Sequence, residues 1–249
     1  MATEAPNFLE RVYHLRTSDF DLHSHILPSS VLDLFQDVAG EHAAMIGIGR
    51  EDLLPLQRCW MILKTQYRVL RQPALFSDVT VRTWPLESHR VDFGREYTVL
   101  DADGQPLLLG SSSWVILDIS RRDTPQIVPA RHIDFGLNEY RTERNFPDGF
   151  ARLSPAFTPA LPPVLHTACY TDLDSNGHVN NIKYADFILN AVPLPSDAEV
   201  EAFQIDYMKE LRLGADIALT HAASEDGKTL LCRGESNGSV NFVARLTLK

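Results

Sequence analysis

Long hydrophobic runs are missing from this chain of 249 residues. No apolar run reaches the roughly 18 to 20 residues that a helix needs to span a bilayer. The N-terminal segment Met1–Pro6 has neither the basic nor the apolar region of a secretory signal. We therefore expect a cytoplasmic protein with no membrane insertion.

Cysteine is scarce as well, with only Cys59, Cys169 and Cys232 in the whole chain. They are irregularly spaced and fall in segments that we expect to be strands, which favours reduced, buried thiols over a disulfide framework. A zinc site needs Cys or His clustered at short spacing, and the sequence has no such cluster. We therefore expect neither a metal nor another cofactor.

Basic residues are in the minority, because 33 Asp and Glu stand against 23 Lys and Arg and give a net charge of -10. Binding to phosphates calls for a basic surface, so this balance argues against nucleic acid as a partner. The chain also lacks a Gly-rich phosphate loop and a G-x-S-x-G nucleophile elbow. Nucleotide-binding and serine hydrolase functions of those kinds have no support.

A short segment is present twice. Residues 19–26 read D-F-D-L-H-S-H-I and residues 172–179 read D-L-D-S-N-G-H-V, so both fit D-[FL]-D-x-x-x-H-[IV]. The offset is constant, since 172 minus 19 and 178 minus 25 both give 153. An internal repeat of this kind indicates a duplicated structural unit within one chain.

Each copy is followed by a segment with the apolar spacing of a helix. The first begins at Pro28, a residue well suited to a first helical turn, and runs to Met45. The second runs from Ile182 to Asn190, and both are apolar around most of their circumference, so each should be enclosed. Segments rich in β-branched and aromatic residues follow and are expected strands. They are 60–70, 77–85, 90–100 and 107–118 in the first half, and 201–211, 217–223, 229–235 and 240–248 in the second.

These elements predict an α+β fold of two fused units, each an antiparallel sheet wrapped around a central helix, with the two sheets continuous. The N-terminal unit spans residues 1–120 and the C-terminal unit spans 164–249. Residues 121–163 are charged and rich in proline, so they should form a long irregular connection.

The second copy of the repeat carries a recognisable resemblance. Residues 170–184 read Y-T-D-L-D-S-N-G-H-V-N-N-I-K-Y. This stretch resembles the active-site motif D-x-N-x-H-V-N-N-x-x-Y of plant and bacterial acyl-acyl carrier protein (acyl-ACP) thioesterases. A simpler form, D-x-x-x-H-V-N-N-x-x-Y, also occurs in single-unit hot-dog thioesterases, including those that act on acyl-CoA. The resemblance implies two fused hot-dog units and a thioester hydrolase that releases free fatty acid from acyl-ACP, which terminates fatty acid synthesis.

The motif suggests a role for each polar residue. Thioester hydrolysis develops an oxyanion, which needs donors placed beforehand, and the start of a helix offers unpaired N–H groups. The resemblance implies that Asn176 and His178 hold or polarise the thioester and its attacking water, while Asp174 orients them. Glu210 matches the family's Glu, and Leu211 replaces the Cys that follows it, so a Cys-His-Asn scheme cannot operate there.

A carboxylate acting on water remains, and Glu210 is our candidate general base. Asp174 competes with it as base or nucleophile. A purely structural explanation stays open for each residue: His178 as a helix cap, Asp174 as a turn former and Glu210 as an ordinary carboxylate at a strand end.

The first copy has lost part of the polar set. Asp21 and His25 persist, but His23 stands where the second copy has Asn176, and Pro28 at the helix start has no backbone N–H. We expect this unit to be catalytically silent and to supply the acyl pocket. The candidate pocket residues, any of which could instead be plain core, are Val31, Leu34, Phe35, Val38, Met45, Trp60 and Ile62.

The resemblance implies two binding partners, acyl carrier protein as the substrate carrier and a fatty acyl chain. Acyl carrier protein is acidic, so a chain of net charge -10 needs a local basic face to bind it. Two sets of cations are candidates for that face: Arg50, Arg58, Lys64, Arg68 and Arg71, or Arg121, Arg122, Arg131, Arg141, Arg144 and Arg152.

Other functions stay open at this point: an acyl-CoA thioesterase, an enoyl hydratase or dehydratase of hot-dog type, and a non-catalytic acyl-binding protein. A hydratase would use His with a carboxylate but gives no reason for Asn176 and Asn180-Asn181. The intact second motif speaks against a mere binding module. Fusion of two units removes the need for a homodimer to complete a hot-dog pair, so both a monomer and a homodimer are possible.

Overall fold

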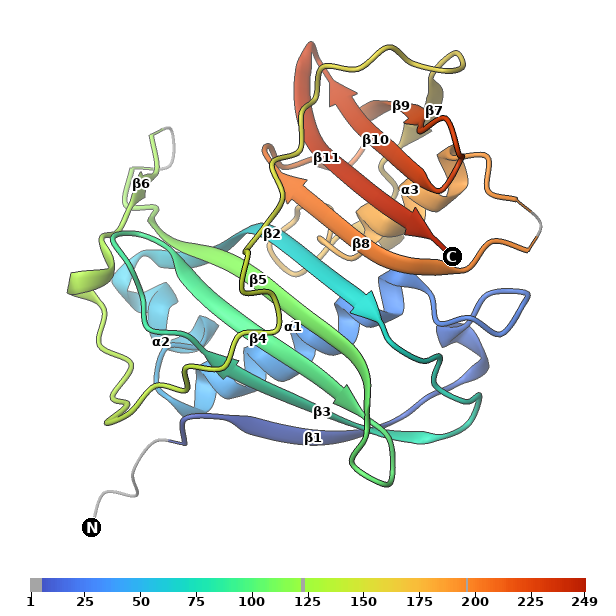
Figure 1. The fold of residues 1–249 in the computed structure, drawn as a ribbon. Coiled ribbons are helices and arrows are strands. Elements are labelled where there is room, and N and C mark those ends of the chain that lie inside the picture. Colours follow the sequence, from blue (N-terminus) through green and yellow to red (C-terminus); the bar gives the residue numbers. More distant parts are fainter. Residues whose placement is uncertain (1–5, 122–123, 196) are drawn as a thin grey trace.

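One antiparallel sheet runs through both halves of the chain in this computed structural model, which describes residues 6–121, 124–195 and 197–249 (Figure 1). Met1–Ala5 and the candidate Arg122 lie outside the described residues. The strand order is β1-β3-β4-β5-β2-β8-β11-β10-β9-β7, with β6 paired to β5. This confirms the predicted α+β class and the continuous sheet.

The elements of the two halves follow the same order. The first half holds β1 (Leu9–His14), α1 (Pro28–Met45), α2 (Arg50–Leu53), β2 (Arg58–Val69), β3 (Asp78–Pro85), β4 (Phe93–Leu100) and β5 (Pro106–Asp118). The connection holds β6 (Gln126–Ile127). The second half holds β7 (Val164–Thr167), α3 (Lys183–Ala191), β8 (Val200–Tyr207), β9 (Asp216–Ala223), β10 (Thr229–Ser236) and β11 (Ser239–Leu248).

The halves meet where β2 pairs with β8. The register runs antiparallel from Lys64 opposite Asp206 to Arg68 opposite Ala202. The Lys64 ammonium lies 2.7 Å from a carboxylate oxygen of Asp206, so an ion pair crosses the same junction. The two units are therefore joined by backbone hydrogen bonds as well as by the chain between them.

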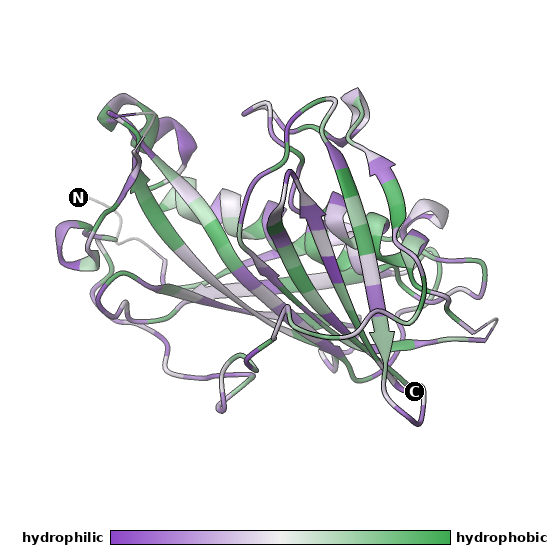
Figure 2. Ribbon diagram, turned by 90° about the horizontal axis from the view of Figure 1, so that it is seen from above, coloured by the Kyte–Doolittle hydropathy of each residue, from purple (hydrophilic) through white to green (hydrophobic). Residues whose placement is uncertain are grey.

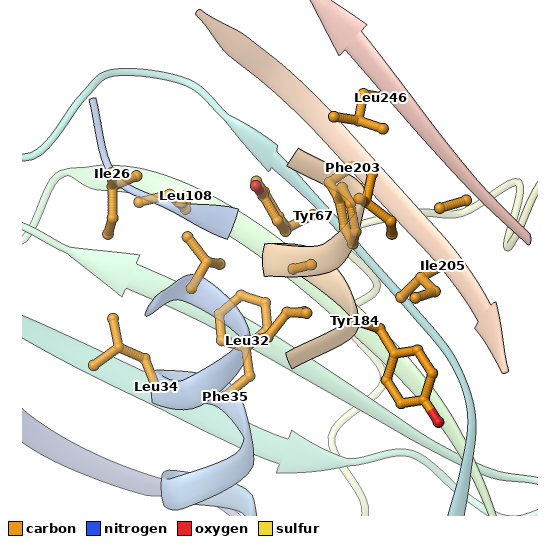
Figure 3. Close-up of a cluster of buried hydrophobic side chains, with 14 of the residues drawn as sticks. Ile26, Leu32, Leu34, Phe35, Tyr67, Leu108, Tyr184, Phe203, Ile205 and Leu246 are labelled. Atoms are coloured by element: carbon orange, nitrogen blue, oxygen red, sulfur yellow. The ribbon is translucent and has the colours of Figure 1, made fainter. Parts of the chain in front are cut away.

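Both long helices lie on one face of the sheet (Figure 1). The core is the layer of side chains between these helices and the sheet (Figure 3). Burial alternates along the strands, as in β10, where every second side chain is buried. Hydrophobic and hydrophilic residues are likewise interspersed along the strands (Figure 2). Such alternation gives one core face and one outer face. α1 comes close to β5 at Gly110, where a Cβ would collide with the ring of Phe35. The Phe35 ring stacks on Tyr97 with 4.3 Å between centroids.

The opposite, outer face of the sheet is crossed by a part of the connection that we call the strap, residues 145–155. The backbone N–H of Asn145 donates to Glu96 at 2.9 Å, Gln66 donates to the carbonyl of Gly149 at 3.1 Å, and Gln204 donates to that of Ala151 at 2.8 Å. Polar side chains from both halves thus fix the strap to the sheet. Burial raises the pKa of Glu96 to about 7.

Two expectations about single residues are wrong. Cys169 is exposed and lies outside the strands, before a short 3-10 turn, whereas Cys59 lies in β2 and Cys232 is buried in β10. Met45 ends α1 in an exposed position rather than on the buried face (48% exposed), whereas His42 and Ala43 of the same turn are buried. No helix among the described residues is long and apolar enough to cross a membrane.

Candidate active site

A tight turn before α3 places the polar residues of the second repeat. The carboxylate oxygen Oδ1 of Asp174 accepts from the backbone N–H of Asn176 at 2.8 Å and of His178 at 3.2 Å. Its other oxygen accepts from the Asn176 side-chain amide at 3.2 Å. Gly177 takes a positive φ of 76°, which suits glycine. Asp174 is therefore committed to holding the turn.

The first repeat builds the same turn. Oδ1 of Asp21 accepts from the backbone N–H of His23 at 2.8 Å and of His25 at 2.9 Å. Isolated bridges close both turns, Phe20 with Ile26 and Leu173 with Val179. The repeated aspartates at 21 and 174 therefore explain the shape of the two loops, and the chemistry must come from residues that differ.

Glu210 reaches the second turn from a segment that follows β8. The expected strand to Leu211 is wrong, because β8 ends at Tyr207. The carbonyl of Asn241 on β11 accepts from the N–H groups of both Met208 and Lys209, at 2.8 and 3.1 Å, so the regular ladder stops here. The buried Asn241 side chain then donates to the carbonyls of Lys209 and Glu210, at 3.1 and 3.4 Å.

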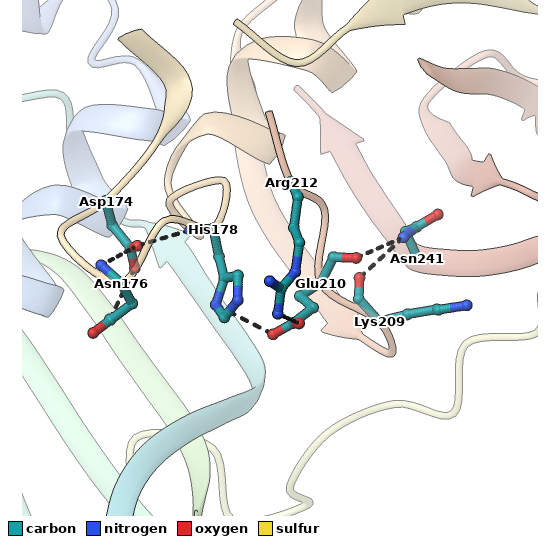
Figure 4. Close-up of polar contacts among 7 residues, drawn as sticks. All are labelled: Asp174, Asn176, His178, Lys209, Glu210, Arg212 and Asn241. Carbon is teal, nitrogen blue, oxygen red and sulfur yellow. Dashed lines mark hydrogen bonds and ion pairs between the residues drawn. The ribbon is translucent and has the colours of Figure 1, made fainter. Parts of the chain in front are cut away.

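The side chains of His178 and Glu210 meet between the two segments (Figure 4). Nδ1 of His178 lies 3.2 Å from Oε2 of Glu210, and Arg212 donates to the other oxygen, Oε1, at 2.9 Å. His178 is 29% and Glu210 is 52% exposed, so solvent and a ligand can reach both. Leu211 points into the core instead and is buried. The backbone N–H of Val179 donates to the Leu211 carbonyl at 2.9 Å and fixes the two segments together.

The start of α3 contributes less than expected. The helix begins at Lys183, and the N–H groups of Ile182 and Lys183 already bond to the side chain and the carbonyl of Asn180, at 3.3 and 2.9 Å. The sequence led us to expect free N–H groups here. Side-chain donors of the turn are thus the main polar groups that a ligand would meet.

A thiol from the first unit lies beside this cluster. Cys59, on β2, has its pKa raised by burial and, to a smaller degree, by the negative charge of Glu210. The site therefore lies at the junction of the two units. A thiol with a raised pKa is a poor nucleophile, so Cys59 does not supply the cysteine that position 211 lacks. The described residues hold no group of His, Cys, Asp and Glu that could bind a metal ion.

Comparison with known proteins identifies the family of this chain. Residues 6–131 match the acyl-ACP thioesterase N-terminal domain, and residues 165–246 match the acyl-ACP thioesterase C-terminal domain. The chain belongs to the acyl-ACP thioesterase family. The match confirms the resemblance drawn from residues 170–184.

Curated relatives of this acyl-ACP thioesterase family member are distant. An oleoyl-acyl carrier protein thioesterase from Coriandrum sativum is 23% identical over 196 residues, which covers 73% of this chain and 53% of the relative. A palmitoyl-acyl carrier protein thioesterase from Gossypium hirsutum is 26% identical over 193 residues, covering 73% and 46%. The chain spans about half the length of the curated relatives that it matches.

Solved structures agree over nearly the whole chain. An acyl-ACP thioesterase from Bacteroides thetaiotaomicron has a TM-score of 0.81 at 22% identity and covers 98% of both chains. A 12:0-ACP thioesterase from Umbellularia californica has a TM-score of 0.84 at 19% identity, again covering 98% of both. At such identities the likeness shows the fold, and it confirms the predicted hot-dog architecture.

Two of the seven predicted acyl-pocket residues line a cavity in this family member. Phe35 and Ile62 face a space of about 10 Å³ that also touches Asn181 and Tyr207 of the second unit. The other five lie elsewhere. Val31, Leu34 and Val38 are core residues, Trp60 packs against a separate cluster around the C-terminal end of α1, and Met45 is exposed.

Sequence reasoning missed several residues that shape the site. Arg212 pairs with Glu210 and lies only two positions after it, but a lone surface arginine gives no signal. Asn241 holds the segment that carries Glu210 from a strand of its own, and no motif marks it. Asn181 lines the cavity and belongs to the recognised motif, so of these three residues it is the one that the sequence could have identified.

Proposed function

We propose that this protein hydrolyses acyl-ACP thioesters and releases free fatty acids. One observation carries the proposal: Asn176, His178 and Glu210 converge at the junction of the two units in a chain of the acyl-ACP thioesterase family. The reaction needs a base for water and donors for the oxyanion, and this cluster offers both kinds of group.

Glu210 is the proposed general base. Its two oxygens each accept one contact, from His178 and from Arg212, and a carboxylate has further lone pairs with which to accept a water. Water held by Glu210 attacks the thioester carbon, and its proton passes to the carboxylate. When the tetrahedral intermediate collapses, the C–S bond breaks, and the departing thiolate of the carrier takes up that proton, which gives the free fatty acid, the thiol and an ionised Glu210 again. His178, oriented by Glu210 through Nδ1, keeps Nε2 free to contact the water or the thioester.

Asn176 is the proposed donor to the developing oxyanion. One N–H of its side-chain amide is used by Asp174 at 3.2 Å, which fixes the amide and leaves the second N–H for substrate. Asp174 then orients the turn, and its three hydrogen bonds make it less suited to act as base or nucleophile.

The two units have different roles in this proposal. The N-terminal unit, residues 1–120, is catalytically silent and supplies the acyl pocket through α1 and β2. The C-terminal unit, residues 164–249, is catalytic, and residues 121–163 connect them. A monomer contains the complete cluster, so activity does not require a homodimer. The three free cysteines fit a reducing compartment, and we place the protein in the cytoplasm. Cell fractionation with an antibody checks that location.

Acyl carrier protein is the proposed substrate carrier, with acyl-CoA as the competing one. Four candidate docking cations are already paired with carboxylates: Arg50, Lys64, Arg71 and Arg141. Arg58 and Arg68 have no ion pair within the described parts of the chain. Arg58 directly precedes Cys59, the residue beside Glu210, so we favour it for docking.

The first experiment compares the two carriers. We expect a higher kcat/KM for acyl-ACP than for acyl-CoA of equal chain length, and the acyl-ACP rate should fall as salt rises because charge attraction is screened. Arg58→Glu should lower kcat/KM for acyl-ACP more than Arg68→Glu does. Equal values for both carriers with no dependence on salt would point to acyl-CoA or to a non-specific hydrolase.

The second experiment tests the base. Glu210→Gln keeps the size of the side chain but cannot accept the proton, so kcat should fall by about 100-fold or more, in the range of general base catalysis. Lys209→Gln, one position away on the same segment, serves as the control. Turnover by Glu210→Gln close to that of the wild type would remove Glu210 from this role.

A further inference from the structure

The small cavity between the two units contains a polar group that has no partner. Its walls come from α1, β2, β4 and β5 of the first unit and from Asn181, Ile182 and Tyr207 of the second. Its volume of about 10 Å³ leaves room for one water-sized group. Thr65 on β2 lines it and is only 2% exposed, and its hydroxyl has no hydrogen-bond partner among the residues that the structure describes.

An unpaired hydroxyl is unusual in such a place. Buried polar groups in proteins are nearly always hydrogen-bonded, because losing water without gaining a partner costs free energy. The neighbouring Ser112, opposite Thr65 on β5, shows the ordinary case: its hydroxyl contacts the Tyr97 hydroxyl at 2.8 Å and accepts from the Trp114 indole at 2.7 Å. Thr65 is thus the polar group of this wall that is left for a ligand.

Two further polar side chains face the same space. Gln36 on α1 and Asn181 before α3 both line the cavity, and neither side chain makes a hydrogen bond within the described residues. None of the described residues that line the cavity is charged. The group that suits it is therefore neutral and able to donate or accept a hydrogen bond, such as a hydroxyl or a carbonyl oxygen.

The cavity adjoins the candidate active site. Asn181 follows His178 by three positions, since 181 minus 178 is 3. The Tyr207 hydroxyl donates to the carbonyl of Asn181 at 3.0 Å, and the segment with Glu210 begins directly after Tyr207. A polar group in the cavity would therefore belong to the part of the acyl chain close to the thioester carbonyl.

We propose that the cavity around Thr65 receives an oxygen substituent on the acyl group close to the thioester, so that the preferred substrates are 3-hydroxyacyl or 3-oxoacyl thioesters rather than saturated ones. This inference rests on the proposed hydrolase function. Thr65 is the specificity-determining residue, because its hydroxyl can donate to an oxo group and both donate to and accept from a hydroxyl. A saturated chain leaves Thr65 unpaired.

The test measures kcat/KM for three acyl-ACP substrates of equal length: saturated, 3-hydroxy and 3-oxo. The wild type should prefer at least one oxygenated substrate by about 10-fold or more, since a site built to bond an oxygen discriminates against the analogue without it. Thr65→Val keeps the shape but removes the hydroxyl, and should lower that preference by about 10-fold, so that little or none of it remains. Comparison of the 3-hydroxy and 3-oxo arms tells which oxygen the site accepts.

A matched control is Thr220→Val, a buried threonine on β9 whose hydroxyl donates to the carbonyl of Arg233. It lies outside the cavity, so the substrate preference should stay as in the wild type. A purely structural role for Thr65 would change stability or all rates together and leave the preference unmoved. A wild type without preference, or one that Thr65→Val does not change, overturns the inference.

Failure of the proposed function gives a different result. If no acyl thioester is hydrolysed, the hydrolase proposal fails, and the cavity is then tested by binding alone. Calorimetry with non-hydrolysable amide analogues of the same three acyl-pantetheines supplies the readout. Tighter binding of the oxygenated analogues, lost in Thr65→Val, supports the inference, and equal binding of all three rejects it.

Discussion

The two repeated turns differ in what surrounds them and agree in how they are built. Asp21 and Asp174 hold their turns with the same pair of backbone hydrogen bonds. His178 then meets Glu210 at 3.2 Å, whereas His25 lies 3.6 Å from Asp21 and its Nδ1 is buried without a hydrogen bond. A duplicated backbone can thus keep its shape after one copy has lost the partner that its histidine would need.

A second carboxylate, that of Glu199, lies near His25, but it is already hydrogen-bonded to other residues. Glu199 accepts from Lys249 at 2.8 Å and from Gln72 at 3.2 Å. Burial acts to raise the pKa of Glu199, but these hydrogen bonds and the nearby positive charge outweigh it, and the net shift is downward. Glu199 and Lys249 both belong to the second half, so part of the surroundings of His25 comes from the other unit. The difference between the copies therefore comes from tertiary contacts as well as from the repeat itself.

The largest effect should come from the two histidines. We expect His178→Ala to lower kcat for acyl-ACP by about 100- to 10,000-fold, the range found for residues in general acid–base catalysis. The kcat of the matched variant His25→Ala should stay within about threefold of that of the wild type, because His25 has no counterpart of Glu210 beside it. Steady-state kinetics on both variants decides it. Similar losses in the two would mean that the first turn takes part in the reaction.

The two aspartates should separate stability from activity. Asp21→Ala and Asp174→Ala each remove an acceptor for two backbone N–H groups, so both should lower the free energy of unfolding by about 1 to 3 kcal/mol. Only Asp174→Ala should also lower kcat, by about 10- to 100-fold, because Asn176 and His178 lose their positions. Urea unfolding and kinetics on the same samples provide the measurements. Equal kcat values would show that the turn needs no fixing for catalysis.

The two halves also hold the strap differently, and pH should reveal it. Burial raises the pKa of Glu96 to about 7, whereas in the unfolded chain it ionises near its usual value of about 4.3. Between these values the folded protein binds more protons, so this group lowers the free energy of unfolding as pH rises. The free energy of unfolding of Glu96→Gln, relative to that of the wild type, should therefore rise by about 1 to 3 kcal/mol from pH 4.5 to 8.

Gln204, which holds the strap from the second half, is neutral and serves as the control for that titration. Gln204→Ala should weaken the strap by a similar amount at every pH. Denaturant midpoints across the pH range give both results. A difference between Glu96→Gln and the wild type that stays constant with pH would show that Glu96 titrates normally.

The smallest effect should come from an attempt to restore the first turn. His23→Asn recreates the polar residue that Asn176 supplies in the second copy, but it brings no free carboxylate to His25. In a His178→Ala background we expect no recovery of turnover within the error of a single-turnover assay. Measurable recovery would mean that the residue at position 23 alone silenced the first copy.

Local pattern was enough for most of the fold. The helix from Pro28 to Met45 has the expected bounds, since proline marks its start and apolar spacing its length. The strand ending at Tyr207 was expected to continue to Leu211, because nothing in its sequence shows that two of its N–H groups turn to Asn241, a residue on another strand. The motif named the turn residues of the candidate site but not Arg212 or Thr65, whose importance depends on which neighbours they have or lack.

The pairing of β2 with β8 has a consequence for how the chain could be divided. Five registered residue pairs and the ion pair of Lys64 with Asp206 hold the halves together without help from the peptide bonds of the connection. The connection acts as a tether that keeps each half at a high effective concentration for the other. A cut between residues 134 and 139, ahead of the strap, should therefore leave two fragments that reassemble into one molecule, with reassembly that depends on their concentration.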